Sequence, residues 1–172
     1  MGMNIALLRA INLAGKNMVS MADLRELFTD AGFDNVKTLL QSGNVIFDGK
    51  TTGRFLEQEA EKRLGFAIDF FLRSAREWDA IVDANPFPRQ AKDDPGHLLV
   101  LTLKNVGPTL SRPVEWPGPE IIRVDGRNAY AFYPNGVGRS KFTNAVIEKK
   151  LGTRVTGRNW HTVLKIQAAL RE

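Results

Sequence analysis

Short apolar runs alternate with amphipathic stretches over the first 72 residues, and this order predicts how they fold. Four runs have the length and composition of strands, at residues 4–9, 36–41, 45–47 and 67–72. Two stretches repeat apolar positions at helical spacing and are followed by glycine, at residues 20–31 and 53–64. The resulting order, β-α-β-β-α-β, is that of a ferredoxin-like unit.

The first of these strands is apolar on both of its faces. Ala6 and Leu8 share one face, while Ile5 and Leu7 share the other. A sheet that is covered by helices on one side alone does not need this pattern. We therefore expect the second face to be covered as well, most simply by the rest of the chain.

The second half of the chain repeats the order of the first half less completely. Strands are predicted at residues 97–103, 121–124, 129–133 and 154–156, and helices at residues 74–84, 139–151 and 159–170. A stretch rich in proline and glycine stands where the first half has its first helix. We predict an α+β protein of two tandem ferredoxin-like halves packed together, plus a C-terminal helix. The predicted halves are residues 1–73 and 97–172, joined by a helix and linker at 74–96.

Composition narrows the class of protein. The 172-residue chain has no cysteine, which excludes a disulfide scaffold, a thiol nucleophile and a thiolate metal site. No segment approaches the roughly 18 apolar residues that a membrane span requires. Because no signal peptide opens the sequence, we expect a cytoplasmic protein without a membrane partner.

The net charge of +5 is unevenly distributed along the chain. Residues 1–84 hold ten basic and twelve acidic side chains, whereas residues 85–172 hold fourteen and seven. Such asymmetry is typical of proteins that bind phosphates or polyanions. A solvated basic face that keeps the protein soluble is the alternative interpretation.

Two segments, residues 133–143 and 157–162, combine glycine and basic residues with a predicted helix start. Unpaired N–H groups at a helix start bind anions, and glycine permits close approach of a ligand. The candidate anion or nucleic-acid contacts are Gly136, Gly138, Arg139, Ser140, Lys141, Arg158 and Asn159. A tight turn in which Asn135 or Ser140 caps the helix explains the first segment equally well.

A second set of polar residues follows the ends of strands in the first half. Its members are Arg9, Asn12, Lys16, Asn17, Gln41, Ser42 and Asn44. Because a helix joins the first two strands, the topology leaves open whether these side chains converge. Solvation of loops and formation of turns are the alternative roles.

Neither a catalytic set nor a metal-ligand spacing appears in the sequence. We therefore predict no metal, no cofactor and no catalytic residue, without excluding an enzyme. His97, at the start of a strand, is expected to be structural. Tyr130 and Phe132 share a strand face and offer stacking for bases, although a core role is favoured. His161 has no assigned role, since it lies off the predicted apolar stripe of the last helix, which consists of Trp160, Val163, Leu164 and Ala168.

Several segments together resemble one family. They are Ala6–Asn17, Met21–Arg25, Gln41–Phe47, Asn85–Pro88, Gly138–Lys141 and Arg158–Trp160. On these segments the chain resembles the bacterial domain-of-unknown-function family 1697 from about residue 4 to 170. That family has glycine where this chain has Ala10 and Ala14, and often threonine and asparagine where it has Gly157 and His161. The resemblance implies a tandem ferredoxin-like fold and no established biochemical function.

These observations support one leading hypothesis and two alternatives. The leading hypothesis is a protein that binds a phosphate-bearing ligand, with nucleic acid as the favoured class. The first alternative is an enzyme that acts on a small phosphorylated substrate or a nucleotide. The second is a protein-interaction or homodimerising module that uses an apolar sheet face.

Overall fold

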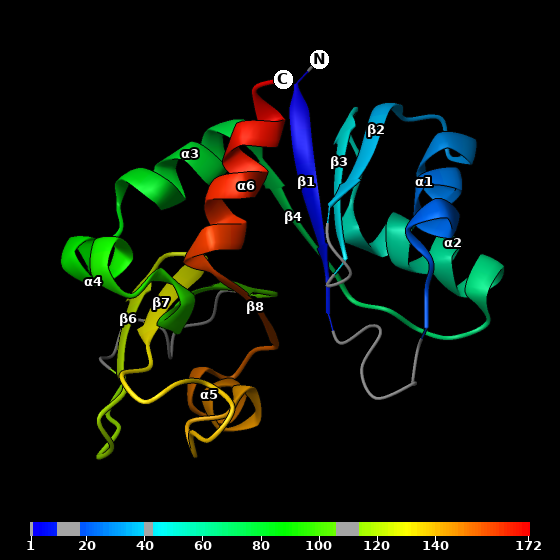
Figure 1. Ribbon diagram of the computed structural model, residues 1–172. Coiled ribbons are helices and arrows are strands. Elements are labelled where there is room, and N and C mark those ends of the chain that lie inside the picture. Colours follow the sequence, from blue (N-terminus) through cyan, green and yellow to red (C-terminus); the bar gives the residue numbers. More distant parts are fainter. Residues whose placement is uncertain (1, 10–17, 40–42, 106–113) are drawn as a thin grey trace. The chain divides into compact units, whose positions relative to one another are not determined.

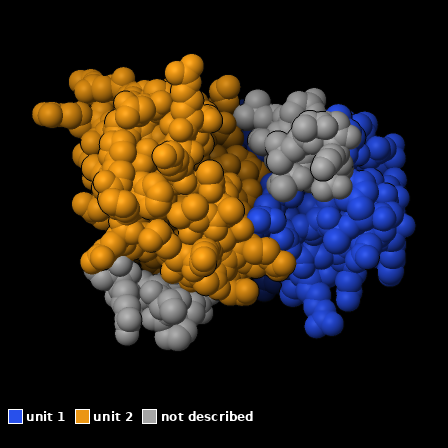
Figure 2. Space-filling model, turned by 90° about the horizontal axis from the view of Figure 1, so that it is seen from below, with its two compact units in different colours: residues 1–80, 166–172 blue, residues 81–165 orange. Residues whose placement is uncertain are grey.

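The computed structural model describes residues 2–9, 18–39, 43–105 and 114–172. Within them the chain is an α+β protein with two four-stranded antiparallel sheets and six α-helices (Figure 1). It divides into two compact units (Figure 2). Unit 1 consists of residues 1–80 and 166–172, and unit 2 consists of residues 81–165.

Unit 1 is built on a sheet with the strand order β2-β3-β1-β4. Its strands and the helices that follow them are β1 (Met3–Leu8), α1 (Met21–Asp30), β2 (Asp34–Leu39), β3 (Asn44–Asp48), α2 (Gly53–Leu64), β4 (Phe70–Ser74) and α3 (Ala75–Asp83). The chain passes into unit 2 within α3. Helices α1 and α2 bury their apolar residues against one face of the sheet (Figure 1).

The centre of this core is a cluster of aromatic rings. Phe28 from α1 lies 5.1 Å from Phe47 on β3, 5.9 Å from Phe33 and 6.2 Å from Phe70 on β4, between ring centroids. The rings are tilted relative to one another, which aromatic pairs prefer over face-to-face contact. On the other face of the sheet, Ile5 and Leu7 are fully buried as well. The prediction that both faces of β1 are buried is confirmed.

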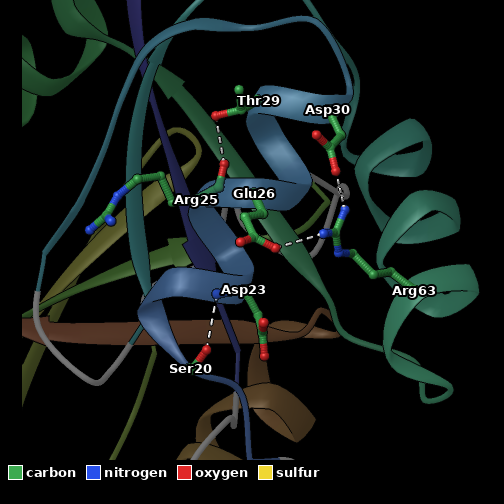
Figure 3. A network of polar contacts seen from close by, with 7 residues as sticks. All are labelled: Ser20, Asp23, Arg25, Glu26, Thr29, Asp30 and Arg63. Carbon is green, nitrogen blue, oxygen red and sulfur yellow. Dashed lines mark hydrogen bonds and ion pairs between the residues drawn. The ribbon is translucent and has the colours of Figure 1, made fainter.

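Local signals place the helices of unit 1. The Ser20 hydroxyl accepts a hydrogen bond from the Asp23 amide and caps the start of α1. Across the helix pair, Arg63 of α2 binds Glu26 and Asp30 of α1 at 3.0 and 2.6 Å (Figure 3). The hydrogen bond that the Arg63 guanidinium donates to the Asp30 carboxylate is the first cause that raises the pKa of Arg63.

Unit 2 is built on a sheet with the order β6-β7-β5-β8. Its elements are α4 (Pro88–Asp93), a 3₁₀ turn (Pro95–His97), β5 (Leu98–Leu103), β6 (Ile121–Asp125), β7 (Asn128–Phe132), α5 (Asn144–Leu151), β8 (Val155–Asn159) and α6 (Trp160–Leu170). The chain returns to unit 1 within α6. The sequence did not predict α4, which begins with proline at its first position.

The two sheets share one pairing register. The second residue of β1, Asn4, pairs with Ser74 at the end of β4, and the second residue of β5, Leu99, pairs with Asn159 at the end of β8. Ser74 and Asn159 then accept hydrogen bonds from amides three residues further on, at the starts of α3 and α6. The repetition that the sequence shows only as a pattern therefore extends to individual positions.

Three sequence predictions need correction. The predicted strand 67–72 lies at Phe70–Ser74. The helix predicted from Arg139 begins instead at Asn144, because Thr143 caps it: its hydroxyl accepts from the Val146 amide at 3.3 Å. In α6, Leu164 and Ala168 are exposed, and Ile166 and Ala169 are buried in their place beside Val163.

Candidate functional site

The segment between β7 and α5 forms a turn that requires glycine. The Gly136 amide donates to the Tyr133 carbonyl at 3.0 Å, and Gly136 has a φ of +88°. A side chain at this angle is strained, whereas glycine adopts it without cost. Gly136 therefore sets the path by which the chain leaves the sheet.

Phe142 and Trp116 anchor the far end of this segment. The Phe142 ring is fully buried and stacks on the Trp116 indole, with the centroids 4.6 Å apart. The Tyr133 hydroxyl donates to the Phe142 carbonyl at 2.9 Å. The far end of the segment is thus held by the ring of Trp116, which is distant in sequence, and by the Tyr133 hydroxyl at the start of the segment.

Glu120 connects this anchor to Ser140. The carboxylate of Glu120 accepts from the Trp116 indole N–H at 2.7 Å, and this bond is the first cause that lowers the pKa of Glu120. A hydrogen bond from Ser140 lowers the pKa of Glu120 further. The Ser140 oxygen also accepts from the Phe142 amide at 3.0 Å. The hydroxyl of Ser140 is therefore held within the loop.

The remaining predicted contacts of this segment face solvent. Gly138, Arg139 and Lys141 are exposed. These residues precede α5, so they do not lie at a helix start as predicted. They belong to a turn that carries two exposed cations, Arg139 and Lys141. Gly136, Gly138, Arg139 and Lys141 are close together because they lie within six consecutive residues of the chain.

Arg158 lies inside unit 2. The residue is only 7% exposed, and this burial lowers the pKa of its guanidinium to about 10. It donates to the Thr156 hydroxyl and to the carbonyl of Gly157, at 2.8 and 2.9 Å. Arg73, at the equivalent position of β4, is also buried and donates to the carbonyl of Leu72 at 2.7 Å. The repeated contact indicates a structural role for this arginine in each sheet.

Asn159 is engaged in the same way. Its side-chain oxygen accepts from the Thr162 amide at 3.0 Å, at the start of α6. This hydrogen bond caps α6 and fixes the orientation of the Asn159 side chain. Arg158 and Asn159 therefore have defined contacts within the protein.

The second predicted cluster is described only in part. Arg9 is half-buried, and its guanidinium lies 3.9 Å from the Asp69 carboxylate. Asn44 is fully buried and donates to the Leu39 carbonyl at 2.8 Å. The other members, Asn12, Lys16, Asn17, Gln41 and Ser42, lie outside the described residues.

His97 has a partner that the sequence analysis missed. The Asp94 carboxylate lies 2.9 Å from its Nδ1, and its carbonyl accepts from the Tyr133 amide at 2.9 Å. A Cβ on Gly136 would lie 3.5 Å from its Nε2, so the imidazole borders the glycine turn. The spacing Asp-x-x-His was the available signal.

Tyr130 and Tyr133, the two tyrosines of the chain, are in the core rather than on a binding face. The Tyr130 hydroxyl donates to the Ile81 carbonyl at 2.7 Å. Burial is the first cause that raises the pKa of each phenol to about 12. Tyr130 therefore does not offer the stacking surface that its strand position allows.

We expect these phenols to make stability fall at high pH. A tyrosine in the unfolded chain ionises near pH 10, whereas in the folded protein both stay neutral until about pH 12. The contribution of the neutral phenols to the free energy of unfolding is thus complete below pH 10. As the pH rises towards 12, the free energy of unfolding falls by roughly 2 kcal/mol for each tyrosine. Urea unfolding of Tyr130→Phe/Tyr133→Phe should show a flatter decline above pH 10. An equal decline in this variant and the unchanged chain contradicts the assignment.

Three further observations concern the described residues. Among them no three histidine or acidic side chains are grouped so that they could hold a metal ion. A pocket of about 240 Å³ lies between α1 and α2, beside the Arg63 ion pairs, and contains none of the predicted site residues. None of the described helices combines the length and the apolar character that crossing a membrane requires.

Comparison with known proteins gives a family and a fold. A family model described as "Protein of unknown function (DUF1697)" matches residues 1–130. No curated protein matches the chain. The solved structure of the conserved bacterial protein SP0830 from Streptococcus pneumoniae is similar, with a TM-score of 0.72 and 21% identity over 98% of each chain. At this identity the likeness concerns the fold.

Proposed function

The chain belongs to the DUF1697 family, which is described as one of unknown function, and we therefore propose a function from the geometry of the site. The protein binds a phosphate-bearing ligand, and nucleic acid is the favoured class. The observation that carries this proposal is the turn of residues 136–141, which presents Arg139 and Lys141 to solvent. Its Ser140 is fixed by contacts to Glu120 and Phe142.

The charge of unit 2 supports the same ligand class. This unit holds thirteen basic and seven acidic side chains, a net charge of +6, whereas unit 1 holds eleven and twelve. Lys149 and Lys150 at the end of α5 are exposed in the same unit. A positive field of this kind attracts polyanions and speeds their association.

We also propose that each half is a ferredoxin-like unit. The element order β1-α1-β2-β3-α2-β4 and the sheet order β2-β3-β1-β4 support this description. The second sheet, with the order β6-β7-β5-β8, has the same register. The domain ranges 1–73, 74–96 and 97–172 remain a prediction.

The test is the salt dependence of binding to single- and double-stranded DNA and RNA. Each phosphate contact contributes a slope of about −0.7 to −0.9 to log K against log salt. We expect Arg139→Gln/Lys141→Gln to weaken binding and to reduce the slope by about 1.5.

A matched variant separates a local site from diffuse charge. Arg123 and Lys165 are exposed in the same unit, so Arg123→Gln/Lys165→Gln removes equal charge elsewhere. This control should leave the slope nearly unchanged. Equal losses in both double variants overturn the assignment of the turn. If all four nucleic acids fail to bind at low salt, nucleic acid is not the ligand.

A further inference from the structure

The hydrogen bond between Asp94 and His97 determines which ring nitrogen of His97 carries the proton. An ionised carboxylate can only accept hydrogen bonds, so at 2.9 Å the Nδ1 of His97 must carry the proton. A neutral imidazole has one donor and one acceptor nitrogen. Its Nε2 is therefore a hydrogen-bond acceptor when the ring is uncharged.

This acceptor lies at the edge of the cationic turn. Nε2 borders Gly136, at 3.5 Å from the position that a Cβ would take there. Arg139 follows three residues later, so its Cα lies within about 11 Å of Gly136. The Ser140 amide donates to the Val137 carbonyl at 3.2 Å, which folds this stretch back on itself.

The combination suits a ligand that presents a donor beside an anion. A phosphodiester offers only acceptor oxygens to the exposed cations, and a neutral Nε2 cannot bind those oxygens. A ribose 2′-hydroxyl, by contrast, can donate to Nε2, and it distinguishes RNA from DNA. We propose that His97, oriented by Asp94, accepts a hydrogen bond from a 2′-hydroxyl, so that the site prefers RNA. This inference rests on the proposed binding of nucleic acid at the turn.

The direct test uses one single-stranded sequence prepared as RNA, as DNA and as 2′-O-methyl RNA. At pH 8 and constant salt, the unchanged protein should bind RNA about three- to tenfold more tightly than the other two, the worth of one hydrogen bond. Equal affinity for RNA and DNA overturns the inference and leaves the proposed function standing. Equal affinity for RNA and 2′-O-methyl RNA overturns it as well. Absence of binding to every probe removes both.

Variants test the role of the pair. His97→Ala should abolish the preference for RNA while it retains the salt slope set by Arg139 and Lys141. Asp94→Asn allows the side-chain amide to donate to Nδ1, which moves the ring proton to Nε2 and should also abolish the preference. His161→Ala is the matched control, because the chain has two histidines and His161 is exposed on α6.

A spectroscopic measurement separates this role from a structural one. The ¹⁵N shift of the His97 ring at pH 8 should show an unprotonated Nε2 in the free protein. RNA, but not DNA, should shift this signal. A protonated Nε2 in the unchanged protein, or identical shifts with RNA and DNA, overturns the proposal.

Discussion

Phe28→Ala is expected to lower the free energy of unfolding of unit 1 by about 3–5 kcal/mol. The ring is fully buried, and it contacts Phe33 in the connection after α1, Phe47 on β3 and Phe70 on β4. Truncation removes the transfer free energy of the ring and leaves a cavity that these neighbours cannot fill without changing rotamer. It also removes three ring pairs, each worth about 0.5–1.5 kcal/mol beyond burial.

The measurement is amide exchange of β1 and β3, which reports the opening of unit 1 without assuming that the whole chain unfolds in one step. Phe55→Ala is the matched control, since Phe55 lies on α2 of the same unit but is 40% exposed. Its cost should stay below about 1 kcal/mol. Equal losses for the two variants contradict the central place of Phe28 in the core.

Features that depend on neighbours in sequence could be predicted. Spacing alone placed α1 and α2, and the side chains of Ser20 and Ser74 cap their helices as the patterns Ser-x-x-Asp and Ser-x-x-Glu indicate. The two-faced apolar pattern of β1 also predicted that both of its faces are buried. These signals are local because capping and strand alternation involve residues within one or two turns of each other.

Features that depend on residues far apart in the chain could not be predicted from the sequence. Nothing near Phe142 shows that its ring stacks on Trp116, 26 positions earlier, and this contact accompanies the irregular path that delays the helix to Asn144. Similarly, the sequence offers Arg158 as an exposed cation beside glycine. Its burial depends on pairing with Val100 in the middle of the sheet.

The candidate site illustrates the same division. Counting charges along the chain located an excess of cations in the second half, which the composition of unit 2 retains. Counting could not say which side chains are available to a ligand. Arg139 and Lys141 face solvent, whereas Arg158 is enclosed. The Asp94–His97 pair was within reach of sequence analysis, since its spacing is one helical turn, but its proximity to Gly136 required the fold.

Phe142→Ala is expected to lower the free energy of unfolding of unit 2 by about 3–5 kcal/mol. Phe142 is fully buried, and its loss removes the stack with Trp116 and the contact with the ring of Tyr133, whose centroid lies 6.3 Å away. The backbone groups that bind Ser140 and Tyr133 remain in the variant, so the change isolates the ring. We therefore expect the loop to lose its anchor while its sequence of charges is unchanged.

Two readouts check this expectation. The Trp116 indole nitrogen lies 2.7 Å from the Glu120 carboxylate oxygen that accepts its proton, and this proton should exchange faster with solvent in Phe142→Ala. Val137→Ala is the control, because Val137 is 43% exposed in the same segment and should cost less than about 0.5 kcal/mol. If the turn needs its anchor to present Arg139 and Lys141, Phe142→Ala also weakens nucleic-acid binding under conditions where the protein stays folded. Unchanged stability and unchanged indole exchange contradict the role of the ring.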